Sequence, residues 1–299
     1  MPENVLTLIA PEATPELRDA AAVAREALGQ LGAGTGAPRW LAADRACDIT
    51  FAELDPDQAD AAARRALGSA RIDLVAQPVE GRRKLLLVAD MESTIIENEM
   101  LDELADLLGI KAQVSEITRR AMNDEIDFAE ALRERVGLLK NLPVTALDEA
   151  GARITIMPGA PQLVATMRAH GAYAALVSGG FRYYTNRIRR ELGFDLDVAN
   201  HLIVADGKLA GTVEEPILTR ETKLETLKQL AAERSLPLSL TLSVGDGAND
   251  LPMIEAAGLG VAYHAKPSVA ARARVRIDHN DLTALLFAQG YRAEEFVAP

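Results

Sequence analysis

The sequence predicts an α/β protein: a doubly wound, Rossmann-like core with a helical cap inserted after its first strand, preceded by a ferredoxin-like α+β domain. Three observations support this fold class. Two short apolar runs, residues 84–89 and 240–244, each lead directly into an acidic cluster, and such runs suit parallel strands that are covered on both faces. Several helical segments follow the first run without an intervening strand. Before it, residues 1–80 alternate between strand and helix patterns.

Residues 1–80 are expected to form a domain of their own. Strands are predicted at 4–10, 40–43, 47–53 and 71–77, and helices at 15–30 and 57–67. This βαββαβ order is the split ferredoxin-like motif, and we expect an ACT-like version of it. Residues 78–81, Pro-Val-Glu-Gly, read as a linker. Because the unit contains no cluster of catalytic residue types, we expect a packing or dimerising module, with a homodimer as one outcome, rather than a ligand-sensing one.

Residues 81–299 are expected to form the core and its cap. The cap, about residues 97–155, would hold helices at 99–108, 113–122, 128–139 and 147–153. A further helix is predicted after Met157-Pro158-Gly159, followed by strands at 173–177, 240–244 and 259–263 and helices at 182–192, 223–233 and 251–257. Residues 201–213 read as a hairpin that turns at Asp206-Gly207. A cap in this place would lie over the ligand-binding edge of the sheet, as a lid.

Charge and composition argue against several partners and locations. The formal net charge is −12 over 299 residues, so no nucleic-acid partner is expected. One cysteine, Cys47, forms no internal disulfide, which fits a reducing compartment. The first 20 residues show no basic start followed by an apolar core, and no apolar run approaches the roughly 18 residues of a membrane helix. We therefore expect a cytoplasmic protein without a membrane partner.

An aspartate directly follows the first strand of the predicted core. From this position the Asp90 carboxylate could attack phosphorus and form an aspartyl phosphate. The alternative interpretation is a helix N-cap, a place that aspartate favours. Glu92 lies two residues further on, so on an extended stretch both carboxyl groups would face the same way. One could then attack while the other handles a proton.

The second acidic cluster, Gly245-Asp246-Gly247-Ala248-Asn249-Asp250, is the most specific signal in the chain. Its two glycines permit a sharp turn, and two carboxylates and an amide are more than a structural turn needs. Since the carboxyl ends of parallel strands meet at one edge of a sheet, the two clusters should converge there. Carboxylates repel one another unless a cation lies among them, so a Mg²⁺ site is predicted.

Two further segments could hold a phosphoryl group. Ser178-Gly179-Gly180 follows a predicted strand and precedes a helix, so its hydroxyl and amides could form a phosphate cradle. A plain strand-to-helix turn is the alternative. Lys223, at the start of another predicted helix, could neutralise phosphoryl oxygens, although an isolated lysine is more often a solvated surface residue. Only the combination with the acidic clusters favours a phosphate site.

The order of these segments resembles the haloacid dehalogenase superfamily of aspartate-nucleophile phosphatases, and within it the phosphoserine phosphatases, over about residues 84–290. The resemblance implies three metal ligands: Asp90, which is also the nucleophile, the backbone carbonyl of Glu92, and Asp246. It implies four residues around the phosphoryl group: Ser178, Gly179, Lys223 and Asn249. Asp250 would support the site.

The same resemblance implies an amino-acid substrate. Glu99, nine residues after Asp90, corresponds to the family's glutamate for the substrate ammonium. Phe128 and Arg135, seven apart on a cap helix, correspond to its apolar wall and its carboxylate-binding arginine. The implied reaction is Mg²⁺-dependent hydrolysis of O-phosphoserine to serine and phosphate, the last step of serine biosynthesis.

Glu92 departs from the family pattern, which has aspartate at this position to protonate the leaving oxygen. Glutamate keeps the acid but adds a methylene, so its carboxyl must fold back to reach the same place. A displacement of about 1 Å can cost on the order of 10²-fold in rate. Two alternatives therefore stay open: a phosphatase or phosphotransferase for another small phosphate ester, and a non-catalytic phospho-ligand sensor coupled to the N-terminal domain.

Overall fold

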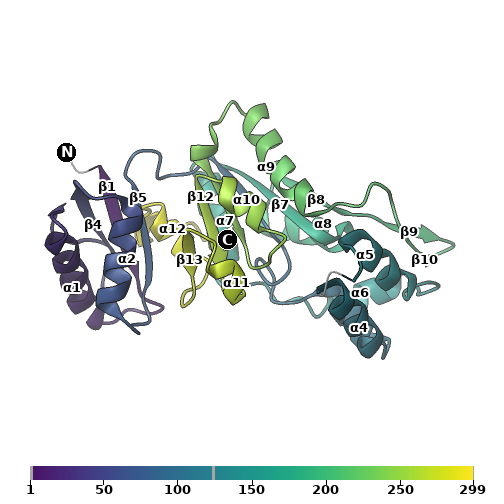
Figure 1. The fold of residues 1–299 in the computed structure, drawn as a ribbon. Helices are drawn as coiled ribbons and strands as arrows, with labels where there is room; N and C mark the ends of the chain where they lie inside the picture. Colours follow the sequence, from purple (N-terminus) through teal and green to yellow (C-terminus); the bar gives the residue numbers. More distant parts are fainter. Residues whose placement is uncertain (1–2, 123–124, 299) are drawn as a thin grey trace.

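The computed structural model describes residues 3–122 and 125–298. Figure 1 shows an N-terminal unit at one end, a central core, and a helical cap at the other end. Residues 1–2 and 299, at the ends of the two expected domains, and residues 123–124 of the expected cap lie outside the described part.

The N-terminal unit is an antiparallel sheet covered by two helices. Its elements are β1 (Asn4–Ile9), α1 (Glu16–Gln30), β2 (Gly34–Thr35), β3 (Arg39–Ala42), β4 (Ala46–Ala52), α2 (Pro56–Leu67) and β5 (Asp73–Pro78). Strand β1 lies between β4 and β5, and β3 pairs with β4. The predicted ferredoxin-like fold is therefore confirmed. The sequence does not predict β2, because two residues leave no periodic signal.

The core is a parallel sheet with the strand order β13-β12-β11-β6-β7-β8. Its strands are β6 (Leu86–Ala89), β7 (Tyr173–Phe181), β8 (Leu196–Asn200), β11 (Thr241–Gly245), β12 (Leu259–Tyr263) and β13 (Val275–Ile277). Strand β6 is the first strand of the core sheet in the sequence, yet it lies between β7 and β11, which confirms the doubly wound topology. Strands β8 and β13 are not predicted, because both are short and carry polar residues among the apolar ones.

Helices cover both faces of this sheet. They are α7 (Ala160–Ala169), α8 (Arg182–Leu192), α9 (Arg220–Glu233), α10 (Leu251–Ala256), α11 (Pro267–Ala270) and α12 (Ala284–Ala288), with 3₁₀ turns at Leu238–Leu240 and Ala293–Glu295. Leu86 and Val88 of β6 pack with apolar side chains of α9 and α10. The alternate residues, Leu87 and Ala89, pack in a second cluster with α7, α8 and α12. Within the described ranges, no helix has the length and apolar character that a membrane crossing requires.

The cap lies between β6 and α7. Its helices are α3 (Met100–Leu107), α4 (Lys111–Met122), α5 (Phe128–Gly137) and α6 (Thr145–Gly151). The predicted hairpin, β9 (Leu202–Ala205) and β10 (Lys208–Val213), turns at Asp206-Gly207 and packs against the cap (Figure 1). The Leu209 N–H donates to the Leu142 carbonyl at 2.8 Å, and the Asn141 N–H donates to the Leu209 carbonyl at 2.9 Å. The hairpin thus joins the core to the second half of the cap, a contact that the sequence does not predict.

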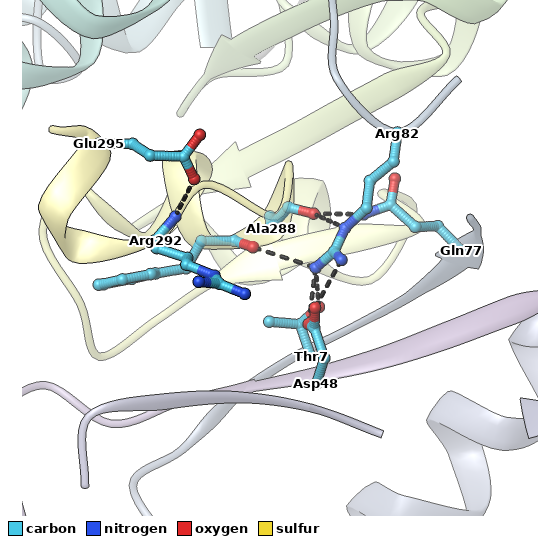
Figure 2. A network of polar contacts seen from close by, with 8 residues as sticks. Thr7, Asp48, Gln77, Arg82, Ala288, Arg292 and Glu295 are labelled. Atoms are coloured by element: carbon cyan, nitrogen blue, oxygen red, sulfur yellow. Dashed lines mark hydrogen bonds and ion pairs between the residues drawn. The ribbon is translucent and has the colours of Figure 1, made fainter. Parts of the chain in front are cut away.

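The face of the N-terminal sheet opposite α1 and α2 packs on the core through apolar side chains. A polar network lies at the same interface (Figure 2). The Arg82 guanidinium lies 2.6 Å from Asp48 and donates to the Thr7 hydroxyl and the Ala288 carbonyl, both at 2.8 Å. Gln77 donates to the same carbonyl at 2.7 Å. This face therefore serves packing within the chain. The division of the chain at residues 80 and 81 stays a prediction.

Asp73 makes a second polar link between the two units. Its buried carboxylate accepts backbone N–H groups of Asp278, His279 and Asn280 at 2.9–3.1 Å, and the Asn280 side chain at 2.8 Å. Asn280 also donates to the Ile9 carbonyl of β1 at 3.0 Å. The loop after β13 is thus held by the strands of the N-terminal sheet.

Candidate active site

Three neighbouring strands bring polar side chains to one edge of the core sheet. Asp90 follows β6, Ser178 lies near the end of β7, and Asp246 follows β11. Oxygen atoms of Asp90, Asp246 and Asp250 lie within 4.8 Å of one another, which confirms that the two acidic clusters converge. The N-cap interpretation of Asp90 is wrong, because the next helix after it in the described chain, α3, begins only at Met100.

Lys223 lies inside this cluster. It is the fourth residue of α9, not its first, and is only 2% exposed. Its ammonium is 2.7 Å from Asp90 Oδ1 and 2.6 Å from Asp250 Oδ1. Burial disfavours the charge of Lys223, but the two carboxylates outweigh burial and raise its pKa. The residue therefore stays cationic, as a phosphoryl group would need.

The acidic cluster carries more negative than positive charge. Burial and then the charge of Asp250 raise the pKa of Asp90, while Lys223 opposes this. The same two causes raise the pKa of Asp246 to about 6. One ammonium thus faces three carboxylates in a place with little water, so a bound cation would be favoured. Carboxylate oxygens are hard donors, and this set fits Mg²⁺.

A tight turn after β11 supplies two of these carboxylates. Asp250 folds back over Gly245, where any Cβ would collide with its side chain. Its Oδ2 accepts the Gly247 N–H at 2.9 Å, and its Oδ1 accepts Lys223. Asn249 also folds back, so that its Oδ1 lies over Gly247. The turn needs its glycines because side chains of its own acidic and amide residues occupy the space beside them.

The predicted phosphate cradle lies on the end of β7 rather than on a helix terminus. Strand β7 continues through Phe181, and α8 begins only at the next residue. The buried Ser178 hydroxyl accepts the Gly180 N–H at 2.8 Å. The Gly179 carbonyl accepts the side chain of Asn200 at 2.8 Å. Ser178 is therefore fixed by the backbone of its own strand, beside Asp90.

Two glutamates extend the site toward the cap. Glu92 Oε1 accepts the N–H of Met100, the first residue of α3, at 2.9 Å. Glu99 accepts the Ser93 hydroxyl at 2.8 Å. Burial and then the charge of Glu99 raise the pKa of Glu92 to about 7, although the Met100 N–H favours its ionised form. Glu92 is thus poised between its acid and its carboxylate form near neutral pH.

The structure places both predicted cap residues of α5 toward this site. The Phe128 ring comes so close to Gly179 that a Cβ there would lie 3.2 Å from it. Arg135 is half-buried, and its Nε donates to the Ala131 carbonyl at 3.2 Å. Burial lowers the pKa of Arg135, while the charge of Glu92 opposes this, so the two residues interact electrostatically.

Two groups of the site are missed by sequence reasoning. Asn200, at the end of β8, is buried and bridges the Gly179 carbonyl and the Leu218 N–H, each at 2.8 Å. The Met100 N–H holds Glu92. A single asparagine and a backbone amide have no sequence signature, so neither could be found without the fold.

Comparison with known proteins agrees with this geometry. Residues 87–255 match the haloacid dehalogenase-like hydrolase family. The chain is 46% identical to the phosphoserine phosphatase of Streptococcus thermophilus over 199 residues, which cover 67% of this chain and 93% of that protein.

Two solved structures extend the comparison. A haloacid dehalogenase family hydrolase from Salmonella enterica serovar Typhi is similar over 96% of this chain and 98% of its own, with 27% identity and a TM-score of 0.84. A phosphoserine phosphatase, solved as an analogue of its phospho-aspartyl intermediate, is 40% identical over 69% of this chain and 98% of its own, with a TM-score of 0.64. From its motifs, its fold and these relatives, the chain belongs to the haloacid dehalogenase-like hydrolases and, within them, to the phosphoserine phosphatases.

Proposed function

We propose that this protein hydrolyses O-phosphoserine to serine and phosphate through an aspartyl phosphate formed on Asp90. The observation that carries the proposal is the place of Asp90 at the end of the central strand. There its Oδ1 lies 2.7 Å from the Lys223 ammonium, and Ser178 follows on the neighbouring strand. The 46% identity to a phosphoserine phosphatase supports the choice of substrate.

In the first step, an Asp90 carboxylate oxygen attacks phosphorus and the bond from phosphorus to the serine oxygen breaks. Glu92 gives its proton to that oxygen, so serine leaves as an alcohol. Lys223 and the Ser178 hydroxyl face the charge on the phosphoryl oxygens. Because phosphoryl transfer depends mainly on positioning and charge stabilisation, a buried lysine fixed by two carboxylates is well suited to this role.

In the second step, water releases phosphate and restores Asp90. Glu92, now a carboxylate, takes a proton from the attacking water. A pKa of about 7 lets this group give and accept protons near neutral pH. Glu92 Oε2 lies 3.5 Å from the Ser178 hydroxyl, so the acid is already beside the phosphoryl cradle.

We propose Asp90, Asp246 and the backbone carbonyl of residue 92 as the Mg²⁺ ligands. Bound Mg²⁺ would supply positive charge that stabilises the phosphoryl oxygens in the transition state. Asp250 is already engaged by Lys223 and the Gly247 N–H, so its role is to orient the site.

Phosphate release from O-phosphoserine should depend on this metal. Treatment with EDTA is expected to abolish release, and Mg²⁺ in excess of the chelator should restore it. Mg²⁺ should also raise the melting temperature, since a ligand at 100 times its Kd stabilises by about 2.7 kcal/mol. Asp246→Asn should remove most of this shift. Full phosphate release by metal-free protein would contradict the metal assignment, and no release with Mg²⁺ present would contradict the proposed function.

We propose that Arg135 and Glu99 bind the carboxylate and the ammonium of the substrate. In the described part of the chain the Arg135 guanidinium forms no ion pair, so its fork is available to a substrate carboxylate. Glu99 is exposed near the start of α3. Together they would select the head group of an amino acid.

Arg135→Ala should therefore weaken catalysis selectively. For O-phosphoserine we expect a loss in kcat/KM of roughly 30- to 5,000-fold, mostly in KM, which corresponds to the about 2–5 kcal/mol of a broken buried charge pair. Phosphoethanolamine lacks the carboxylate, and its kcat/KM should change much less. Steady-state kinetics on both substrates provide the measurement.

Arg133→Ala is the matched control, because Arg133 lies on the same helix but is exposed and pairs with Glu215 at 2.8 Å. Its kinetic constants should stay within about threefold of the unchanged protein. Equal losses on both substrates in the Arg135 variant would refute the assignment.

A further inference from the structure

The Glu92 carboxylate is held between the cap and the phosphoryl cradle. Its Oε1 accepts the Met100 N–H at 2.9 Å, while its Oε2 lies 3.5 Å from the Ser178 hydroxyl. A side chain shorter by one carbon–carbon bond, about 1.5 Å, would not reach both groups from the same backbone position. The glutamate therefore occupies space that an aspartate would leave open.

That space exists because residue 180 is glycine. A Cβ on Gly180 would lie 2.6 Å from Glu92 Oε2 and 3.1 Å from Glu92 Cδ. The first distance is far inside van der Waals contact, so an added methyl group and the carboxylate cannot both keep these positions. The backbone of Gly180 does not adopt the left-handed conformation that favours glycine. Space for Glu92, and not backbone freedom, is thus what the structure requires at this position.

We propose that Gly180 is a positioning residue for Glu92: the absence of a side chain forms the recess in which the carboxylate one methylene longer than aspartate is seated for proton transfer. The inference rests on the proposed function, which gives Glu92 that transfer. It also predicts that the requirement for glycine at residue 180 depends on which acid stands at residue 92.

A second contact must be separated from this one. The same Cβ would lie 3.1 Å from the Ser178 hydroxyl oxygen, which is tight but can be relieved by a small shift. This contact does not involve residue 92. Damage to the cradle would therefore be the same with glutamate or aspartate at that position, whereas displacement of the acid would not.

The test is a double-mutant cycle of Gly180→Ala and Glu92→Asp, with Mg²⁺ present and O-phosphoserine as substrate. With Glu92 in place, Gly180→Ala is expected to lower kcat by about 10²-fold or more, the cost of a displacement near 1 Å. In the Glu92→Asp background, the same change should cost less than about tenfold. Losses that multiply without coupling would overturn the proposal. If the unchanged protein does not release phosphate, the proposed function fails instead, so the two failures are distinguishable.

A second readout separates the acid from the cradle. The burst of nitrophenolate from 4-nitrophenyl phosphate reports the first step with a leaving group that needs little protonation. Gly180→Ala should retain this burst, because Asp90 and the cradle still work, while turnover of phosphoserine falls. Loss of the burst rate to the same extent as phosphoserine turnover would place the damage at Ser178 and overturn the proposal.

Gly179→Ala is the matched control. A Cβ on Gly179 would meet the Phe128 ring at 3.2 Å instead of Glu92. Its loss should be the same in the glutamate and aspartate backgrounds. Melting temperatures of all variants complete the test. If Gly180→Ala alone does not fold, recovery of folding by the added Glu92→Asp supports the proposal, and failure of the double variant to fold contradicts it.

Discussion

Replacing Asp90 with asparagine is expected to lower kcat for O-phosphoserine by at least about 10⁴-fold while the protein stays folded. The amide has nearly the size of the carboxylate but cannot attack phosphorus, and loss of a nucleophile costs several orders of magnitude in comparable enzymes. Stability should be preserved, because Lys223 keeps its 2.6 Å partner Asp250. Removing one charge also relieves repulsion among the buried carboxylates.

Rapid acid quenching with ³²P-labelled phosphoserine gives the direct measurement. The unchanged protein should carry label as an acyl phosphate that hydroxylamine removes, and the Asp90→Asn protein should carry none. A melting temperature close to that of the unchanged protein serves as the control for folding. Label on the asparagine variant, or turnover above about a hundredth of the original, would mean that another group is the nucleophile.

The acidic residues of the site could be predicted from the sequence because they lie in short contiguous segments directly after apolar strands. Asp90 and Asp246 each follow an apolar strand, and the geometry of parallel strands alone predicts that such ends meet. The structure confirms this with carboxylate oxygens within 4.8 Å of one another. The prediction that Lys223 lies in the site depended on the combination of motifs, because no local sequence feature distinguishes a buried lysine from a solvated one.

Features that depend on contacts between distant segments could not be predicted. The position of the Glu92 carboxylate depends on the Met100 N–H and on the space beside Gly180. The Gly179 carbonyl is held by Asn200, which lies on a strand whose sequence is too polar to be recognised as one. A periodic pattern reports which face of an element is buried, but not which partner covers it. The packing of the N-terminal sheet on the core could not be predicted for the same reason.

The second large expected effect concerns the stability of this packing between the N-terminal sheet and the core. Arg82→Ala is expected to lower the free energy of unfolding by about 3–5 kcal/mol, because it leaves a buried carboxylate without its partner. The Asp48 side chain is only 4% exposed, and Arg82 reaches it at 2.6 Å (Figure 2). The carbonyl of Ala288 would lose a donor as well. Urea unfolding, followed by circular dichroism and by fluorescence of Trp40, measures the change.

Arg274→Ala is the control, because it removes an ion pair that also joins the two units but is exposed to solvent. Arg274 of the core pairs with Asp57 of the N-terminal unit at 2.7 Å, but the two side chains are 54% and 70% exposed. A solvated pair contributes less than about 1 kcal/mol, so this variant should unfold almost as the unchanged protein does.

The fluorescence of Trp40, the single tryptophan of the chain, reports the N-terminal unit, and circular dichroism reports the whole chain. Both signals should change together, because one apolar cluster includes Ile9 and Val75 of the N-terminal sheet and Leu285 of the core. Equal effects of the two substitutions would show that the Arg82 network contributes no more to stability than a surface ion pair does.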